Sequence, residues 1–310
     1  MLVWELIGAA IGAGFASGRE ITVFFAQYGH WGFAGLAAAG GMLLLAGEPL
    51  PASWHKRWPE KVWQIMLSLL LITTGGAMLA GAGEIWAQVL PVKWSQAIGM
   101  VVTFGVSWLL AMKTKTGLAW VSKGLVAALM LLLLLAFRLQ PMQGAVIVEQ
   151  AGLIATLSGG SYGGFNAALQ WPILAATTIE KQKKRSALRW ATILILMMLL
   201  LGMLLMQRHK ALMGEAMPFL LMMKQFGAGG YIGFIICLYL AVLSTLTACI
   251  RAVQGRAFPM AGIFLVSCGG FGGVVNLMYP LLGGGCCIML LLAKITNSYT
   301  GSFLSRKDML

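Results

Sequence analysis

Two glycine-rich runs interrupt apolar segments of the chain. The first covers residues 12–18 (GAGFASG) and the second covers residues 158–166 (SGGSYGGFN). Glycine at this density destabilises a helix. Backbone groups that are freed inside a bilayer find no water, so unwound backbone is tolerated there only where it lines a cavity or is buried in protein. Two such interruptions at corresponding places in the halves of a chain indicate the binding site of a transporter.

The first interruption offers main-chain groups of both polarities to a ligand. N–H groups at the start of the outer half-helix, near Ala13 to Ser17, have no intrahelical partner and favour a carboxylate. The inner half-helix is expected to end near Ile11, where its freed carbonyl oxygens suit a cation. The two ends together match a zwitterion, or a carboxylate that binds with sodium.

Polar side chains flank the second interruption. Tyr162 can donate a hydrogen bond or stack on a ligand, and the Asn166 amide is both donor and acceptor. The predicted substrate site comprises Gly12, Ala13, Gly14, Phe15, Ser161, Tyr162, Gly163, Phe165 and Asn166. The alternative is structural, because small residues let membrane helices pack closely and polar side chains hydrogen-bond between them. Matching positions in the two halves favour the site.

The composition requires a polytopic membrane protein. The 310 residues are 59% hydrophobic and only 10% charged, which no soluble domain matches. A spanning helix needs about 20 apolar residues. We expect an all-α fold with ten spans, near residues 2–26, 31–50, 62–84, 95–112, 116–137, 145–179, 190–206, 229–250, 258–275 and 277–293. These spans leave no room for a folded domain outside the membrane, and the connector 207–230 is expected to hold a short surface helix.

The net charge of +13 reflects topology rather than a nucleic-acid partner. With a cytoplasmic amino terminus, most Lys and Arg residues fall in the inside loops, as the positive-inside rule requires. Both termini are then cytoplasmic, and the expected location is a bacterial inner membrane. We expect the lipid bilayer and a small solute as partners, and no obligatory protein partner.

The spans divide into two groups of five, residues 1–140 and 141–310, within one membrane domain. An odd number of spans per group makes the second group enter the membrane from the opposite side, which is inverted-repeat geometry. The five cysteines show no metal-ligand spacing with histidine, and no nucleophile has a base nearby. The sequence therefore predicts neither an enzyme nor a cofactor.

Residues 12–21 (GAGFASGREI) closely resemble the first-helix signature of the YkvI-type family of proposed amino acid permeases. Residues 162–166 look like the sixth helix of that family, and residues 279–283 (YPLLG) look like its entry to the tenth. The resemblance covers essentially the whole chain. It implies membership of the amino acid–polyamine–organocation superfamily, whose LeuT-type fold is a five-plus-five inverted repeat with broken first and sixth helices.

The same resemblance implies a sodium site between the first and eighth helices. Sodium symporters of this fold use first-helix carbonyls with an eighth-helix run that ends in two hydroxyls. The positions in this chain are Gly8, Ile11, Ala241, Ser244 and Thr245. The alternative is that Ser and Thr bond back to their own helix. Proton-coupled relatives instead place a fifth-helix lysine at this site, and Lys123 is the candidate here, although its place near the span end favours snorkelling to the interface.

Two charged residues, Arg19 and Glu20, lie in the outer half of the first span and are candidates for a gate or for coupling. The expected function is a secondary transporter for a small polar solute, an amino acid or similar zwitterion, driven by sodium or protons. A ligand-sensing subunit, similar to the permease-like subunits of spore germinant receptors, is the alternative. Ligand binding without flux would distinguish it.

Overall fold

A computed structural model describes residues 2–46, 60–113, 117–139, 151–175, 180–207, 214–253 and 257–292. Within these ranges the chain is almost entirely helical, with short turns between helices and no strand. The helices of the first half are α1 (Leu2–Ala10), α2 (Ala13–Ala16), α3 (Arg19–Phe24), the 3-10 helix η1 (Ala26–Trp31), α4 (Gly32–Ala46), α5 (Glu60–Val89), α6 (Ser95–Lys113) and α7 (Gly117–Leu139).

The second half continues the same all-helical pattern. Its helices are α8 (Gly152–Ala175), α9 (Glu180–Met206), α11 (Pro218–Met223), the 3-10 helix η3 (Lys224–Phe226), α12 (Gly227–Val253), α13 (Ala257–Ser267), α14 (Phe271–Gly273) and the π-helix η4 (Val274–Met278), after which residues 279–292 are helical. The connector 207–230 does hold a short helix, α11, but the expectation of a surface helix is wrong, because its apolar residues Phe219, Leu220 and Met222 are buried against the bundle.

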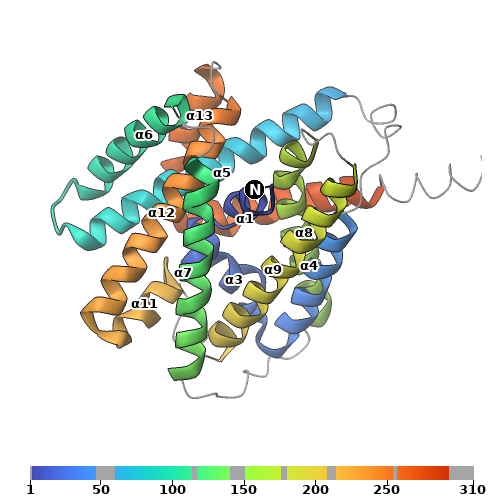
Figure 1. The fold of residues 1–310 in the computed structure, drawn as a ribbon, viewed down its shortest axis with the longest axis horizontal. Coiled ribbons are helices and arrows are strands. Elements are labelled where there is room, and N and C mark those ends of the chain that lie inside the picture. The colour runs from blue at the N-terminus through green and yellow to red at the C-terminus, as the bar shows by residue number, and fades with distance from the viewer. Residues whose placement is uncertain are drawn as a thin grey trace, which may run out of the picture.

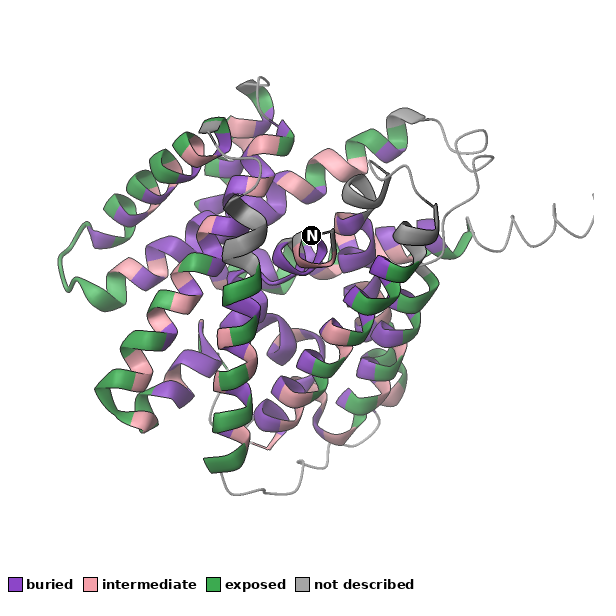
Figure 2. Ribbon diagram, in the orientation of Figure 1, coloured by how far each residue is buried: buried purple, intermediate pink, exposed green. Residues whose placement is uncertain are grey.

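Five helical segments in the described ranges are long and apolar enough to cross a bilayer: Val62–Val89, Ser95–Met112, Arg185–Met206, Pro218–Val253 and Phe271–Leu292. Large apolar side chains such as Leu131, Leu153 and Phe258 are exposed on the outer faces of the bundle. Figure 2 shows the exposed residues on the peripheral helices and the buried ones at the centre. A surface of this kind suits lipid rather than water, so the chain is a multi-pass membrane protein.

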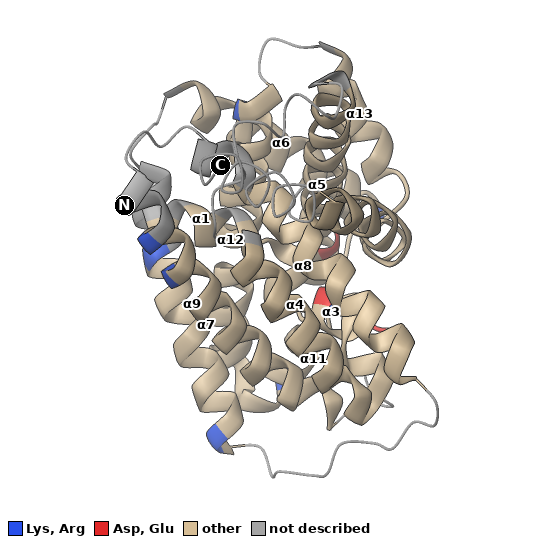
Figure 3. Cartoon of the chain, turned by 90° about the vertical axis from the view of Figure 1, so that its right-hand side faces the viewer, with Lys and Arg blue, Asp and Glu red and all other residues tan. Residues whose placement is uncertain are grey.

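The first helix lies at the centre of the bundle. In Figure 1, α1 is seen close to end-on in the middle of the molecule, with α7 to its left and α9 below it to the right. It packs against α7, α8, α9 and α12. Basic residues gather where α9 begins, close to the amino terminus of the chain, and acidic residues lie within the bundle around α3 (Figure 3). The central position explains why the side chains around the first interruption are buried.

The prediction of a break in the sixth span is wrong, because α8 is helical without interruption through residues 158–166. Its glycines serve close packing on two faces. A Cβ at Gly159 would collide with the Gly35 carbonyl of α4, and one at Gly163 would lie 2.8 Å from the Ala39 carbonyl. On the other face, a Cβ at Gly164 would lie 2.6 Å from the Cys287 nitrogen. The glycines of α8 therefore let two neighbouring helices approach its backbone.

Two other span limits differ from those expected. The ninth helix ends at Ser267 rather than near 275, since the Ser267 hydroxyl bonds back to the Phe264 carbonyl at 2.7 Å and Gly270 turns the chain with a φ of 70°. The next helix therefore starts at Phe271. The seventh begins at Glu180, ten residues before the expected start at 190, because the basic run continues as helix beyond the apolar core.

Candidate functional site

The predicted break in the first span is present. Helix α1 ends at Ala10, and the Ile11 N–H completes its last turn by donating to the Ile7 carbonyl at 2.8 Å. Gly12 is extended, with φ −94° and ψ −170°, and α2 starts again at Ala13. A second turn follows at Gly18, whose φ of 80° lies in the left-handed region that favours glycine. The first span is thus three short helical pieces rather than one rod.

A methionine from α5 fills the first gap. The Ala13 N–H donates to the Met78 sulfur at 3.1 Å. A Cβ at Gly12 would lie 2.8 Å from both the Met78 sulfur and its terminal carbon, so only glycine leaves room for this side chain. A thioether is a weak acceptor. One of the N–H groups expected to hold a carboxylate is therefore already paired, although weakly.

The turn at Gly18 brings the Glu20 carboxyl back toward α2, just beyond the gap at Gly12. The Glu20 carboxyl carbon would lie 2.7 Å from a Cβ at Gly14, so the carboxyl rests against the bare backbone of α2. The Tyr162 hydroxyl of α8 donates to Glu20 Oε2 at 3.0 Å. Glu20 is only 4% exposed. The predicted residues Gly14 and Tyr162 are brought together here, and Glu20 joins them.

Aromatic rings pack around the Tyr162 side chain that bonds to this carboxyl. The Tyr162 ring lies 5.0 Å from that of Phe24 and 5.2 Å from that of Phe25, measured between centroids. One turn further along α8, Phe165 stacks on Tyr279 at 4.4 Å. The Tyr279 hydroxyl is buried near Glu20 and next to Thr74, and it forms no hydrogen bond of ordinary geometry in the described part of the chain. The site thus combines an acid, apolar rings and a buried hydroxyl.

The predicted sodium ligands also meet. Thr245 Oγ1 of α12 lies 3.2 Å from the Gly8 carbonyl and 3.4 Å from the Ile11 carbonyl, at the unwound end of α1. Ser244 Oγ, one residue earlier, bonds the Ala241 carbonyl at 3.0 Å. Of the five oxygens that the resemblance implies, the structure thus brings Thr245 to the carbonyls of Gly8 and Ile11, whereas the Ser244 hydroxyl bonds back to its own helix, as in the alternative interpretation. Lys123 is exposed on α7 and is not part of this buried group.

Arg19 connects the first span to two distant parts of the bundle. Its Nη1 donates to the Glu215 carbonyl at 2.6 Å, and its Nη2 donates to Asn276 Oδ1 of η4 at 2.9 Å. The Phe219 N–H of α11 donates to the Ser17 carbonyl at 2.7 Å. The connector before α12 and the π-helix are therefore both fastened to the broken first span.

Other predicted residues of α8 have structural partners. The Asn166 amide donates to the Tyr162 carbonyl of its own helix at 3.1 Å. A Cβ at Gly283 would contact the Ser161 carbonyl, which places Ser161 at the interface with helix 279–292, while Gly163 packs on α4. Phe15 is buried beside the first gap. Of the second glycine run, only Tyr162 touches the acidic group.

Sequence reasoning missed several contributors. Met78 is one of 20 methionines and carries no local signal. Tyr279 was assigned only to a family motif. Gln170 is fully buried, and neither atom of its amide has a partner among the described residues. Its spacing of four from Asn166 and eight from Tyr162 puts all three on one face of α8, and that spacing could have revealed this polar stripe.

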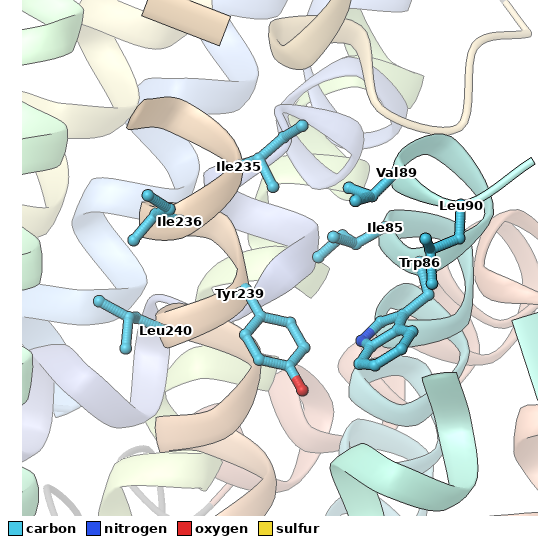
Figure 4. Close-up of a pocket in the computed structure, with 8 residues that line it drawn as sticks. All are labelled: Ile85, Trp86, Val89, Leu90, Ile235, Ile236, Tyr239 and Leu240. Atoms are coloured by element: carbon cyan, nitrogen blue, oxygen red, sulfur yellow. The ribbon is translucent and has the colours of Figure 1, made fainter. Parts of the chain in front are cut away.

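A separate groove runs between α5 and α12, and Figure 4 shows its lining. The lining residues are Ile85, Trp86, Val89, Leu90, Ile235, Ile236, Tyr239 and Leu240. The Tyr239 hydroxyl already shares a hydrogen bond with Thr103 at 3.0 Å. The groove is apolar and does not suit a small polar solute.

Comparison with known proteins agrees with the resemblance seen in the sequence. No family model matches the chain. It is 30% identical over 227 residues to an uncharacterized membrane protein, YkvI, of Bacillus subtilis. The match covers 64% of this chain and 63% of that relative, so it spans somewhat less than two thirds of the relative's length. This similarity confirms that the chain resembles the YkvI-type membrane proteins.

Proposed function

We propose that this protein is a secondary transporter that moves a small polar solute, in the first instance an amino acid, together with sodium. The observation that carries the proposal is the group of oxygens around Thr245 at the unwound end of α1. Three carbonyls and two hydroxyls give five neutral oxygens, the hard ligands that a small hard cation prefers. The same hydroxyls that now bond to the carbonyls can turn their oxygens to an ion.

The position of this group supports coupling between ion and solute. Ile11 contributes a candidate ion ligand, and Gly12 and Ala13 follow it directly in the gap that Met78 fills. An ion at Gly8 and Ile11 would fix the conformation of the residues that line the adjoining site. The exposed position of Lys123 favours sodium over a lysine-bound proton at this place.

The arrangement proposed for the whole chain is a ten-span, five-plus-five inverted repeat with one broken helix, the first. The fastening of Arg19 and α11 to the first span gives an outer side that is closed in this conformation. Alternating access then requires those contacts to open while the α1 end closes. We place the protein in a bacterial plasma membrane with both termini in the cytoplasm, and we propose no catalytic activity.

Flux in proteoliposomes tests this function. Purified protein is reconstituted, a mixture of radiolabelled amino acids is supplied outside, and an inward sodium gradient is compared with an inward proton gradient at matched potential. We expect accumulation of at least one amino acid above empty liposomes under the sodium gradient. Accumulation under the proton gradient alone would mean that the coupling ion is a proton rather than sodium. Binding without flux under either gradient would favour a sensing subunit, and neither binding nor flux would refute the proposal.

A further inference from the structure

We infer that the Glu20 carboxylate is the acceptor for an ammonium group on the solute, so that the site selects amines rather than carboxylates. This inference rests on the proposed transport function, because it names the class of solute that the same site takes. It departs from the expectation drawn from the sequence, in which the backbone N–H groups of the first span hold a carboxylate.

Burial is the first observation. Glu20 is 4% exposed at the start of α3, and the structure records one hydrogen bond to it, from Tyr162 to Oε2. The other oxygen rests on the backbone at Gly14. A carboxylate buried away from water is costly unless it meets a cation or several donors. Acidic groups at membrane depth are for this reason associated with ion and substrate pathways.

No side chain in the described part of the chain supplies that cation. Arg19 is the neighbouring residue, yet two of its guanidinium nitrogens are bonded to the Glu215 carbonyl and to Asn276. The groups that act electrostatically with Glu20 are the neutral phenols Tyr162 and Tyr279. A cationic ligand would complete the charge balance that the protein leaves open.

The surroundings suit an ammonium group. The Tyr162 ring, whose hydroxyl bonds to the carboxyl, packs with the rings of Phe24 and Phe25, and aromatic faces attract cations. The buried Tyr279 hydroxyl can accept a further hydrogen bond from an N–H. A solute carboxylate brought to the same place would be repelled by Glu20 and would compete with it for the same donors. The geometry therefore points to primary amines and zwitterions that lead with their ammonium group.

Matched probes test this on the full-length protein. Thermal stability in detergent is measured with three sets of compounds: glycine, methylamine and acetate; leucine, 3-methylbutylamine and 4-methylpentanoate; phenylalanine, 2-phenylethylamine and 3-phenylpropanoate. Each set presents a zwitterion, its amine half and its carboxylate half. We expect at least one zwitterion and its amine to raise the melting temperature, and its carboxylate partner to leave it unchanged.

The variant Glu20→Gln keeps an oxygen for the Tyr162 hydroxyl and removes the charge. A charge-assisted hydrogen bond contributes enough that its loss should weaken amine binding about 10- to 100-fold. Glu84→Gln is the control, because Glu84 is half-exposed and bonds to Gln96 outside this site. It should bind amines like the unaltered protein.

Several outcomes would overturn the inference. They are carboxylate probes that bind where amines do not, none of the nine compounds binding, or an unchanged amine affinity in Glu20→Gln. If that variant binds normally but loses only proton-driven flux, Glu20 carries a proton instead. The wild-type comparison stands even if Glu20→Gln fails to fold. Amine binding without flux would preserve this inference while refuting transport, so the two proposals fail separately.

Discussion

At the scale of single residues, the hydroxyl of Thr245 provides a direct test of the ion site. Thr245→Val keeps the shape of the side chain and removes the oxygen that lies 3.2 Å from the Gly8 carbonyl and 3.4 Å from the Ile11 carbonyl. We expect sodium chloride, compared with potassium chloride at equal concentration, to raise the melting temperature of the unaltered protein. This increase should be lost in the variant, since one of the five ligands is missing.

Thr247→Val is the matched control for that experiment. Thr247 lies two residues along the same helix, and its buried hydroxyl has no partner in the described residues. Its replacement should be neutral or slightly stabilising and should preserve the response to sodium. An equal increase in melting temperature in all three proteins would mean that sodium binds elsewhere. No increase in any of them would mean that sodium does not bind.

Substitutions at two tyrosines distinguish the contribution of a hydrogen bond from that of an aromatic contact. Tyr162→Phe keeps the ring against Phe24 and Phe25 but removes the donor to Glu20, leaving the buried carboxyl without that partner. We expect a loss of stability of about 1–3 kcal/mol, measured as a lower melting temperature in detergent. Tyr279→Phe removes a hydroxyl that forms no hydrogen bond of ordinary geometry within the described ranges, so it should cost far less. Equal losses in the two variants would mean that the bond to Glu20 is not stabilising.

At the scale of elements, the glycines of α8 differ sharply in what they face. Gly163→Ala would bring a Cβ to 2.6 Å from Met42 Cβ and 2.8 Å from the Ala39 carbonyl of α4, and backbone cannot move aside cheaply. We expect a destabilisation of about 1–3 kcal/mol from this overpacking. In Gly160→Ala the nearest atom is the Cys287 sulfur at 3.6 Å, which is ordinary contact.

Gly160→Ala should instead be neutral or stabilise the protein by up to about 1 kcal/mol, because alanine favours the helix over glycine. Melting temperatures of the two variants provide the comparison. If both substitutions were harmless, close packing would not explain the glycine run.

The two glycine runs show which parts of the fold can be predicted from sequence. Both contain enough glycine to weaken a helix, but the physical reason why glycine is needed differs between the two runs. At Gly12 the extended backbone makes room for Met78, whereas at Gly159 and Gly163 the missing Cβ makes room for α4. The choice depends on which helix lies opposite, and this information is spread over distant parts of the chain. The apolar helices follow from local hydropathy, while contacts such as Met78 with Ala13 have no local signal.

The predicted sites show the same limit at the level of individual contacts. Thr245 meets Gly8 and Ile11 as the family pattern implies, because the pattern carries tertiary information from related folds. The sequence makes Glu20 a candidate for a gate or for coupling from its position in the outer half of the span. The turn at Gly18 folds its side chain back onto Gly14, a contact that has no local signal in the sequence. A single residue with positive φ thus decides whether this acid faces the outside or the binding site.

At the scale of the whole molecule, the proposed inverted repeat makes a prediction about sidedness. Lys93 lies between α5 and α6, and Arg185 lies near the start of α9, and both are exposed. Three helices, α6, α7 and α8, separate the two positions, so an odd number of crossings must place them on opposite sides of the membrane. From the concentration of basic residues near the start of α9 we predict that Arg185 faces the cytoplasm.

Single cysteines introduced as Lys93→Cys and Arg185→Cys, in a background where the five native cysteines are replaced, report this directly. A maleimide that cannot cross membranes should label position 93 in intact cells and position 185 only after permeabilisation. Flux activity of the cysteine-free background shows that its fold is retained. Labelling of both positions from the same side would mean that one of the three helices does not cross. The second half could not then be inverted relative to the first, and the alternating-access mechanism would lose its structural basis.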